Sequence, residues 1–125
     1  MKKGKGVKRR SGFEDKIEAQ LKKAKVKYGY ESERIKYKVP EREATYIPDF
    51  VLRGGDLIIE CKGRFTSHDR KKMALVIEAN PTLDIRMVFM RDNYLRKGSK
   101  TKYSDWANKN NVKYAIGEVP TEWLK

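Results

Sequence analysis

The sequence predicts a single domain of the mixed α/β class, in which helices pack in layers against a sheet. Segments whose apolar residues recur at helical spacing alternate along the chain with short runs rich in Val, Ile and Tyr, a pattern typical of this class. The 125 residues suffice for one domain with a modest core, and no internal repeat or low-complexity segment interrupts them. The predicted order of elements is helix, strand, β-hairpin, helix, strand, helix, strand.

The first predicted helix begins at Ser11, directly after residues 1–10, which we expect to form a flexible basic arm. Ser11 and Glu14 have the spacing of a capping box, in which a hydroxyl and a carboxylate each accept a hydrogen bond from a backbone N–H group at the helix start. We expect the helix to end near Lys25. Four residues at helical spacing define its apolar face: Phe13, Ile17, Leu21 and Ala24.

The middle of the chain predicts extended structure. Residues 28–39 alternate loosely and contain several Tyr and Ile, so they predict one or two strands. Residues 40–47 are polar and begin with a proline, so we expect a stiff connector there. The runs 49–53 and 56–62 predict a hairpin, because the Gly-Gly pair between them tolerates the positive φ angles of a two-residue primed turn.

The C-terminal half alternates between helical and strand patterns. Ser67 can cap a second helix, in which Asp69 in the first turn complements the helix dipole, and Asn80-Pro81 ends that helix. The remaining predicted elements are a strand at 84–90, a basic loop at 91–102, a short helix at 105–110, a strand at 113–116 and a terminal turn from Thr121.

The register of the hairpin places two carboxylates opposite each other. With Gly54 and Gly55 as the turn, Asp49 faces Glu60, and directly opposed Cβ atoms lie about 4.5–5.5 Å apart. Like charges at that distance repel, so a divalent cation bound between them would reverse the sign of the interaction. Because side chains alternate along a strand, Lys62 shares the face of Glu60. The sequence therefore predicts an Asp, a Glu and a Lys on one patch of the sheet.

This combination of side chains suits metal-dependent phosphodiester hydrolysis. Mg²⁺ prefers oxygen ligands, polarises a phosphoryl oxygen and lowers the pKa of a bound water, while an ammonium can orient that water or stabilise developing charge. The alternative is a solvated hairpin face on which Lys62 pairs with Glu60, but an unpaired carboxylate within the apolar run 57–61 would be costly. Glu14 has two interpretations, a capping residue or a third acidic ligand, and spacing does not decide between them.

The charge of the chain predicts a polyanionic partner. Thirty Lys and Arg against seventeen Asp and Glu give a net charge of +13. Phosphate contacts would offset the resulting self-repulsion and release condensed counterions, whereas a solubilising surface is the alternative. The basic run at 70–72 fits a solvated helix face equally well. The residues that we expect to contact DNA are Lys8, Arg9, Arg10, Arg70, Lys71, Lys72, Lys97, Lys100 and Lys102.

The remaining reactive and aromatic residues indicate structural roles. The single cysteine, Cys61, lies in an apolar run, so we expect a buried, unreactive thiol. His68 lies beside the expected helix cap without a companion ligand, so we expect a surface position. Tyr103, Trp106 and Trp123 are expected to pack in the core or in a dimer. Neither a signal sequence nor an apolar stretch of about 18 residues is present, so we expect a cytoplasmic protein without membrane contact.

The step from Pro48-Asp49 to Glu60-x-Lys62 resembles the motif of the PD-(D/E)xK nuclease superfamily, whose core is a helix followed by a sheet bearing these residues. The resemblance can be narrowed, because short blocks from about Ser11 to the C-terminus occur in an order similar to that of the phage endonuclease I family of Holliday-junction-resolving enzymes. These blocks are 11–16 (SGFEDK), 38–40 (KVP), 45–50 (TYIPDF), 60–63 (ECKG), 69–72 (DRKK), 83–89 (LDIRMVF) and 122–125 (EWLK).

This resemblance implies a restriction-endonuclease-like mixed sheet flanked by helices, in a domain-swapped homodimer that cuts four-way and other branched DNA. It implies Mg²⁺ or Mn²⁺ as the cofactor, no small-molecule cofactor, and action in the cytoplasm of the host cell. In a swapped dimer Glu14 would act in trans, and residues 40–47 would bridge the two lobes. The implied catalytic residues are Glu14, Asp49, Glu60 and Lys62. The implied metal ligands are Asp49, Glu60, the backbone carbonyl of Cys61, and Glu14.

We therefore expect a structure-selective endodeoxyribonuclease that resolves branched DNA. One alternative is a PD-(D/E)xK endonuclease without junction preference, which would cut a junction and a linear duplex at equal rates. The other is a catalytically silent basic DNA-binding protein, which would bind DNA in a salt-sensitive manner and cut nothing.

Overall fold

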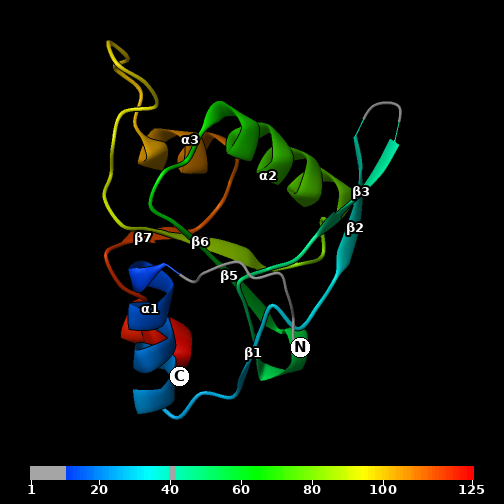
Figure 1. Cartoon of the computed structure of the whole chain (residues 1–125), viewed down its shortest axis with the longest axis vertical. Coiled ribbons are helices and arrows are strands. Elements are labelled where there is room, and N and C mark those ends of the chain that lie inside the picture. The colour runs from blue at the N-terminus through cyan, green and yellow to red at the C-terminus, as the bar shows by residue number, and fades with distance from the viewer. Residues whose placement is uncertain (1–10, 40–41) are drawn as a thin grey trace.

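A computed structural model describes residues 11–39 and 42–125 of the chain. Five strands of this part form one sheet in the order β1-β4-β5-β6-β7, and β2 and β3 form a two-stranded sheet that extends away from it (Figure 1). The helices are α1 (Gly12–Lys23), α2 (Ser67–Ala79) and α3 (Tyr103–Lys109). The strands are β1 (Tyr28–Tyr30), β2 (Ile35–Val39), β3 (Arg42–Tyr46), β4 (Phe50–Leu52), β5 (Leu57–Lys62), β6 (Ile85–Phe89) and β7 (Tyr114–Ile116).

The five-stranded sheet is mixed, so the predicted mixed α/β class is confirmed. The pairs β1–β4 and β4–β5 are antiparallel, whereas β5–β6 and β6–β7 are parallel. Parallel neighbours need a crossover connection, and α2 and α3 supply the two crossovers. These two helices lie on one side of the sheet and α1 lies on the other (Figure 1).

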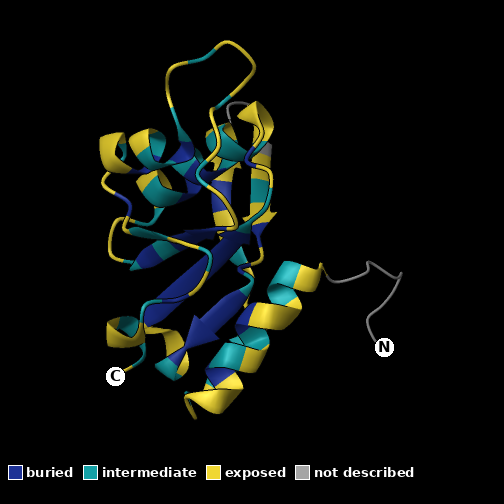
Figure 2. Cartoon of the chain, turned by 90° about the vertical axis from the view of Figure 1, so that its left-hand side faces the viewer, coloured by how far each residue is buried: buried dark blue, intermediate teal, exposed yellow. Residues whose placement is uncertain are grey.

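Strand β5 runs through the middle of the molecule and divides the core into two clusters. Ile59 belongs to the cluster that includes Ile17 of α1, whereas Ile58 belongs to the cluster that includes Val76 of α2. Neighbouring residues of a strand face opposite sides, so each side of β5 contributes to a different cluster. Burial on both faces explains why the sequence of β5 is almost uniformly apolar. Figure 2 shows the buried strands between partly exposed helices.

Both main helices begin with a hydroxyl cap, but not entirely as expected. The Ser11 hydroxyl accepts a hydrogen bond from the Glu14 N–H at 3.1 Å, as predicted. The Glu14 carboxylate instead accepts a hydrogen bond from the Tyr30 hydroxyl. For α2 the expected cap Ser67 is wrong by one residue, because Thr66 forms a reciprocal capping box with Asp69. Asp69 at the third helical position satisfies the Thr66 N–H, which Ser67 as cap would leave without that partner.

The connector expected at 40–47 is wrong for most of that range, because Arg42–Tyr46 forms strand β3 and pairs antiparallel with β2. Ala44 and Tyr46 pack against the cluster beneath α2, while the residues between and before them are exposed. Charged residues hid this period-two pattern in the sequence. The bridge between two subunits predicted for this segment concerns a second chain and stays a prediction, and residues 40 and 41 lie outside the described part.

The hairpin of β4 and β5 has the predicted register but a different turn. Each observed pair matches the expected register: Phe50 with Ile59, Val51 with Ile58 and Leu52 with Leu57. The turn has four residues rather than two, and it contains a 3₁₀ segment in which Arg53 adopts a φ of 52°. The Arg53 guanidinium donates to the carbonyls of Trp123 and Lys125 at 3.0 and 2.7 Å. These contacts with the C-terminal turn explain how a residue other than glycine is held in the left-handed region.

Candidate active site

Asp49 and Glu60 lie side by side at the end of the β4–β5 pairing. Asp49 directly precedes β4, and its backbone N–H donates to Oε1 of Glu60 at 3.4 Å. Its own carboxylate accepts a hydrogen bond from the Cys61 N–H at 2.9 Å. The predicted register therefore brings the two carboxylates into one site, as the sequence indicated.

Burial and mutual repulsion disfavour two charges at this place. Among the described residues Glu60 is the one buried charged side chain, at 6% exposure. Burial raises the pKa of Asp49, and the charge of Glu60 raises it further, to about 8. Burial also raises the pKa of Glu60, although the ammonium of Lys62 opposes that shift. A bound cation would remove both penalties, because it stabilises the ionised form of each carboxylate.

Lys62 lies on the same face of β5 as Glu60 and bridges two carboxylates. Its Nζ is 3.6 Å from Oε2 of Glu60 and 3.5 Å from Oδ1 of Asp69, which belongs to the first turn of α2. Burial lowers the pKa of Lys62, but the charges of Glu60 and Asp69 outweigh burial, so the net pKa is raised. The ammonium is thus protonated at neutral pH and held at a fixed place beside Glu60.

A second acidic group adjoins Asp49 on the side of α1. One carboxylate oxygen each of Glu14, Glu31 and Asp49 lie within 4.8 Å of one another. Hard divalent cations prefer such oxygen donors, so this donor set together with Glu60 fits Mg²⁺ or Mn²⁺. Glu14 therefore lies in the site in addition to opening α1, and both interpretations left open by the sequence hold.

Glu31 is the site residue that sequence reasoning missed. It follows β1 with a φ of 49°, and its N–H donates to the backbone carbonyl of Asp49 at 3.1 Å. This backbone contact holds the residue beside Asp49. A glutamate in a polar stretch after a short strand carries no motif, so only the pairing of β1 with β4 could have indicated it.

The basic residues expected to contact DNA are distributed over several elements. Lys97 and Lys100 are exposed on the loop that projects from the molecule between β6 and α3 (Figure 1). Arg70 donates to the Phe65 carbonyl at 2.7 Å, which gives it a structural role before α2. The ammonium of Lys102 lies 5.3 Å from the Tyr94 ring centroid. Lys71 is exposed, Lys72 is partly exposed, and Lys8, Arg9 and Arg10 lie outside the described residues.

The residues expected to be structural occupy structural positions. Cys61 is a buried free thiol, and burial raises its pKa, followed by the charges of Asp49 and Glu60. His68 is exposed at the start of α2. Tyr103 is buried in the core, against which Trp106 packs, and Trp123 packs against the cluster beside α1. In the described part of the chain, no helix has the length and apolar character needed to cross a membrane.

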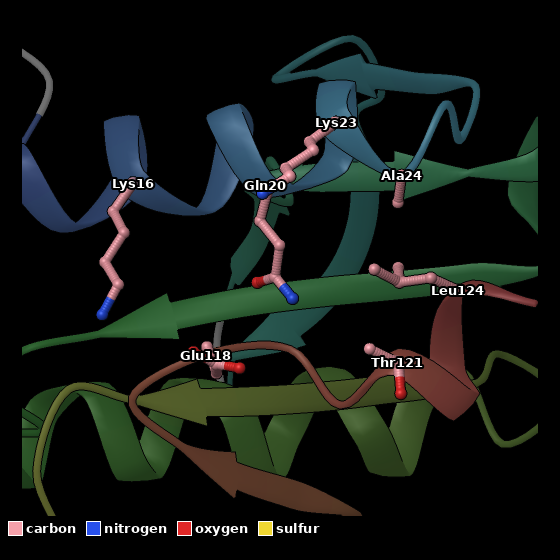
Figure 3. Close-up of a pocket in the computed structure, with 7 residues that line it drawn as sticks. All are labelled: Lys16, Gln20, Lys23, Ala24, Glu118, Thr121 and Leu124. Carbon is pink, nitrogen blue, oxygen red and sulfur yellow. The ribbon is translucent and has the colours of Figure 1, made fainter.

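A hollow between α1 and the C-terminal turn is separate from the carboxylates. Figure 3 shows Gln20 of α1 reaching across the sheet side of this hollow, and its lining includes none of the acidic site residues. The Gln20 side chain donates to the Val119 carbonyl at 2.7 Å and accepts from the Val119 N–H at 3.0 Å. The hollow is therefore a packing seam that fastens the C-terminal segment to α1.

Comparison with known proteins agrees with the motif blocks in the sequence. The whole chain, residues 1–125, matches the family model for phage endonuclease I. Endonuclease I of Escherichia phage T7 is 43% identical over 117 residues, which cover 93% of this chain and 78% of that protein. Endodeoxyribonuclease 1 of Enterobacteria phage T3 is 44% identical over 117 residues, covering 93% of this chain and 76% of that protein. The chain therefore belongs to the phage endonuclease I family.

Proposed function

We propose that this protein is a metal-dependent endodeoxyribonuclease that resolves four-way and other branched DNA in the cytoplasm of a phage-infected host cell. The observation that carries the proposal is the Asp49–Glu60 pair, whose two carboxylates lie partly or fully buried next to Lys62. The relatives are named as DNA endonucleases, and the net charge of +13 suits a DNA substrate.

The acidic residues would hold Mg²⁺ or Mn²⁺. Asp49 and Glu60 are the central ligands, with the backbone carbonyl of Cys61 beside them, and Glu14 and Glu31 extend the donor set toward α1. The bound cation would polarise the scissile phosphoryl group and lower the pKa of a water molecule. These five donors all come from rigid elements or residues next to them, so the site would be assembled before DNA arrives.

Lys62 would act on the phosphate directly. Its ammonium is held between Glu60 and Asp69, which fixes its direction and keeps it protonated. A fixed positive charge beside the scissile phosphate stabilises the negative charge that grows on the phosphoryl oxygens. The position of Lys62 next to a metal ligand is the arrangement that this role requires.

Junction resolution needs two active sites, and we propose a domain-swapped homodimer that provides them. Glu14 and Asp49 come within reach of each other in one chain, and in a swapped dimer the same contacts would form between subunits. The hairpin of β2 and β3 is the segment proposed to bridge the lobes, since its strands lie outside the main sheet. Two symmetric sites match the two opposed strands that must be cut in a four-way junction.

The direct test is cleavage of a four-way junction and of a linear duplex of matched sequence in Mg²⁺. We expect faster cutting of the junction, and a loss of about 100-fold or more in Glu60→Gln and in Lys62→Met with DNA binding retained. Glu78→Gln and Lys109→Met change exposed residues on α2 and α3 and should cut normally. Equal rates on both substrates would contradict junction selectivity, and undiminished cleavage by either site variant would contradict the catalytic assignment.

A mixed dimer tests whether Glu14 acts in trans. One subunit carries Glu14→Gln, the other carries Glu60→Gln, and distinct affinity tags isolate the heterodimer. In a swapped dimer one site of this heterodimer is intact and the other is doubly altered, so we expect one nick per junction. If both parts of a site come from one chain, each site is broken once and no cleavage follows.

A further inference from the structure

Tyr46 at the end of β3 places its hydroxyl in the candidate site, although its ring belongs to the core. The side chain is 1% exposed and lies in the cluster that includes Phe65 and Met73. Its hydroxyl donates to Oε1 of Glu60 at 2.7 Å. A buried tyrosine needs a partner for its hydroxyl. Here that partner is the buried carboxylate of the site.

The hydrogen bond from Tyr46 determines how the Glu60 carboxylate is turned. Oε1 accepts from the Tyr46 hydroxyl at 2.7 Å and from the Asp49 N–H at 3.4 Å, which leaves Oε2 facing Lys62 at 3.6 Å. A hydrogen bond to an ionised acceptor is about twice as strong as one between neutral groups. Without the hydroxyl, the longer contact with Asp49 would be the remaining hydrogen bond to Oε1 among the described residues.

We infer that Tyr46 is a positioning residue that fixes the Glu60 carboxylate in the orientation needed to bind the divalent cation. This inference rests on the proposed function, which makes Glu60 a metal ligand. Tyr46 acts through Glu60 and contacts neither the cation nor the DNA. Hydrogen-bond partners of ligating carboxylates generally act in this way, and their loss weakens metal affinity or activity by about 10–100-fold.

The direction of the Tyr46 hydroxyl is set from two sides of the ring. Tyr46 pairs with Ile35 of β2, so the hairpin fixes its backbone. The ammonium of Lys72 on α2 lies 5.8 Å from the centroid of its ring, a distance at which a cation is attracted to an aromatic face. Hairpin and helix together hold the ring, so the two-stranded sheet becomes part of the support of the site.

A purely structural role for Tyr46 makes a different prediction from positioning. Core filling depends on the ring, which Tyr46→Phe retains, whereas positioning depends on the hydroxyl, which Tyr46→Phe removes. Tyr37 supplies a matched control, because it lies in the same hairpin and the same core cluster at 8% exposure. No hydrogen bond joins Tyr37 to a site carboxylate in the described part of the chain.

The test is Mn²⁺ binding to the full-length protein without DNA, measured from the electron paramagnetic resonance signal of free Mn²⁺. We expect Tyr46→Phe to raise the Mn²⁺ dissociation constant about tenfold or more, and Tyr37→Phe to change it less than about twofold. Melting curves in EDTA verify that each variant is folded at the assay temperature. Wild-type affinity in Tyr46→Phe overturns the inference, and so does an equal loss in Tyr37→Phe, because packing would then explain both.

A second variant separates the hydroxyl from the packing of the ring. Replacing Tyr46 with 4-aminophenylalanine restores a hydrogen-bond donor at the same place, so Mn²⁺ affinity should recover most of the loss. Affinity that stays at the level of Tyr46→Phe contradicts the inference. A wild-type protein that binds Mn²⁺ but cuts no DNA would contradict the proposed function alone. Wild-type cleavage together with unchanged Mn²⁺ binding in Tyr46→Phe would contradict this inference alone.

Discussion

Replacing Asp49 by asparagine should stabilise the metal-free protein while it removes metal-dependent activity. The two carboxylates of Asp49 and Glu60 disfavour each other in the absence of a cation. Asparagine has the same shape and keeps an oxygen that can accept the hydrogen bond from the Cys61 N–H. The substitution therefore removes the charge and leaves the packing in place. Stability and activity are expected to move in opposite directions.

The magnitude follows from the pKa of Asp49, which burial and the charge of Glu60 raise from 3.8 to about 8. A pKa that is higher in the folded than in the unfolded state costs stability as the pH rises between the two values, because unfolding then releases a proton. Each pH unit is worth about 1.4 kcal/mol, so the penalty at pH 7 has an upper limit of about 4 kcal/mol. Relaxation of the site and the loss of attraction to Lys62 reduce the expected gain to about 1–3 kcal/mol.

The assay is urea unfolding in EDTA, followed by tryptophan fluorescence at pH 4.5 and pH 7.5. Asp49→Asn should exceed the wild type in free energy of unfolding at pH 7.5, and the difference should shrink at pH 4.5, where Asp49 is protonated in the fold. Asp56→Asn, in the exposed turn after β4, is the matched control and should show no such gain. Added Mg²⁺ should stabilise the wild type and not Asp49→Asn. An Asp49→Asn protein less stable than wild type at pH 7.5 would refute the reasoning.

Three further predictions follow from single contacts. Asp69→Asn removes the charge 3.5 Å from Lys62 but retains an acceptor for the helix cap, so kcat should fall about tenfold in cleavage assays with KM for DNA unchanged; a change in KM alone would contradict it. Lys97→Ala with Lys100→Ala should make the dependence of log K for DNA on log salt shallower by about 0.9 per lost phosphate contact, and an unchanged slope would remove both residues from the interface. Arg53→Met should lower the free energy of unfolding by about 1–2 kcal/mol in urea titrations, because two hydrogen bonds to the C-terminal turn are lost, and wild-type stability would show that they contribute nothing.

The parts of the structure that sequence reasoning predicted are those set by local patterns. The alternation of side chains along β5 and the length of the apolar runs were enough to predict that Glu60 would lie opposite Asp49. The Ser11 cap and the order of the later elements also depend on residues close together in the sequence. Local pattern therefore fixed both the central strands and the centre of the site.

The parts that were missed depend on contacts between distant segments. Glu31 joins the site because β1 pairs with β4, and nothing near it in the sequence indicates that pairing. Arg53 adopts its left-handed conformation in contact with Trp123, seventy residues away. Tyr46 was hidden because charged neighbours disguised β3 as a connector. In each case a tertiary contact overrides or supplements the local signal.

The most direct measurement of the metal site is an anomalous difference map from crystals of the protein soaked in Mn²⁺. We expect a peak within bonding distance of the carboxylates of both Asp49 and Glu60, and no peak at that place in crystals of Glu60→Gln. A Mn²⁺ ion bound only elsewhere, or a peak unchanged in Glu60→Gln, would contradict the claim that these two carboxylates hold the cation.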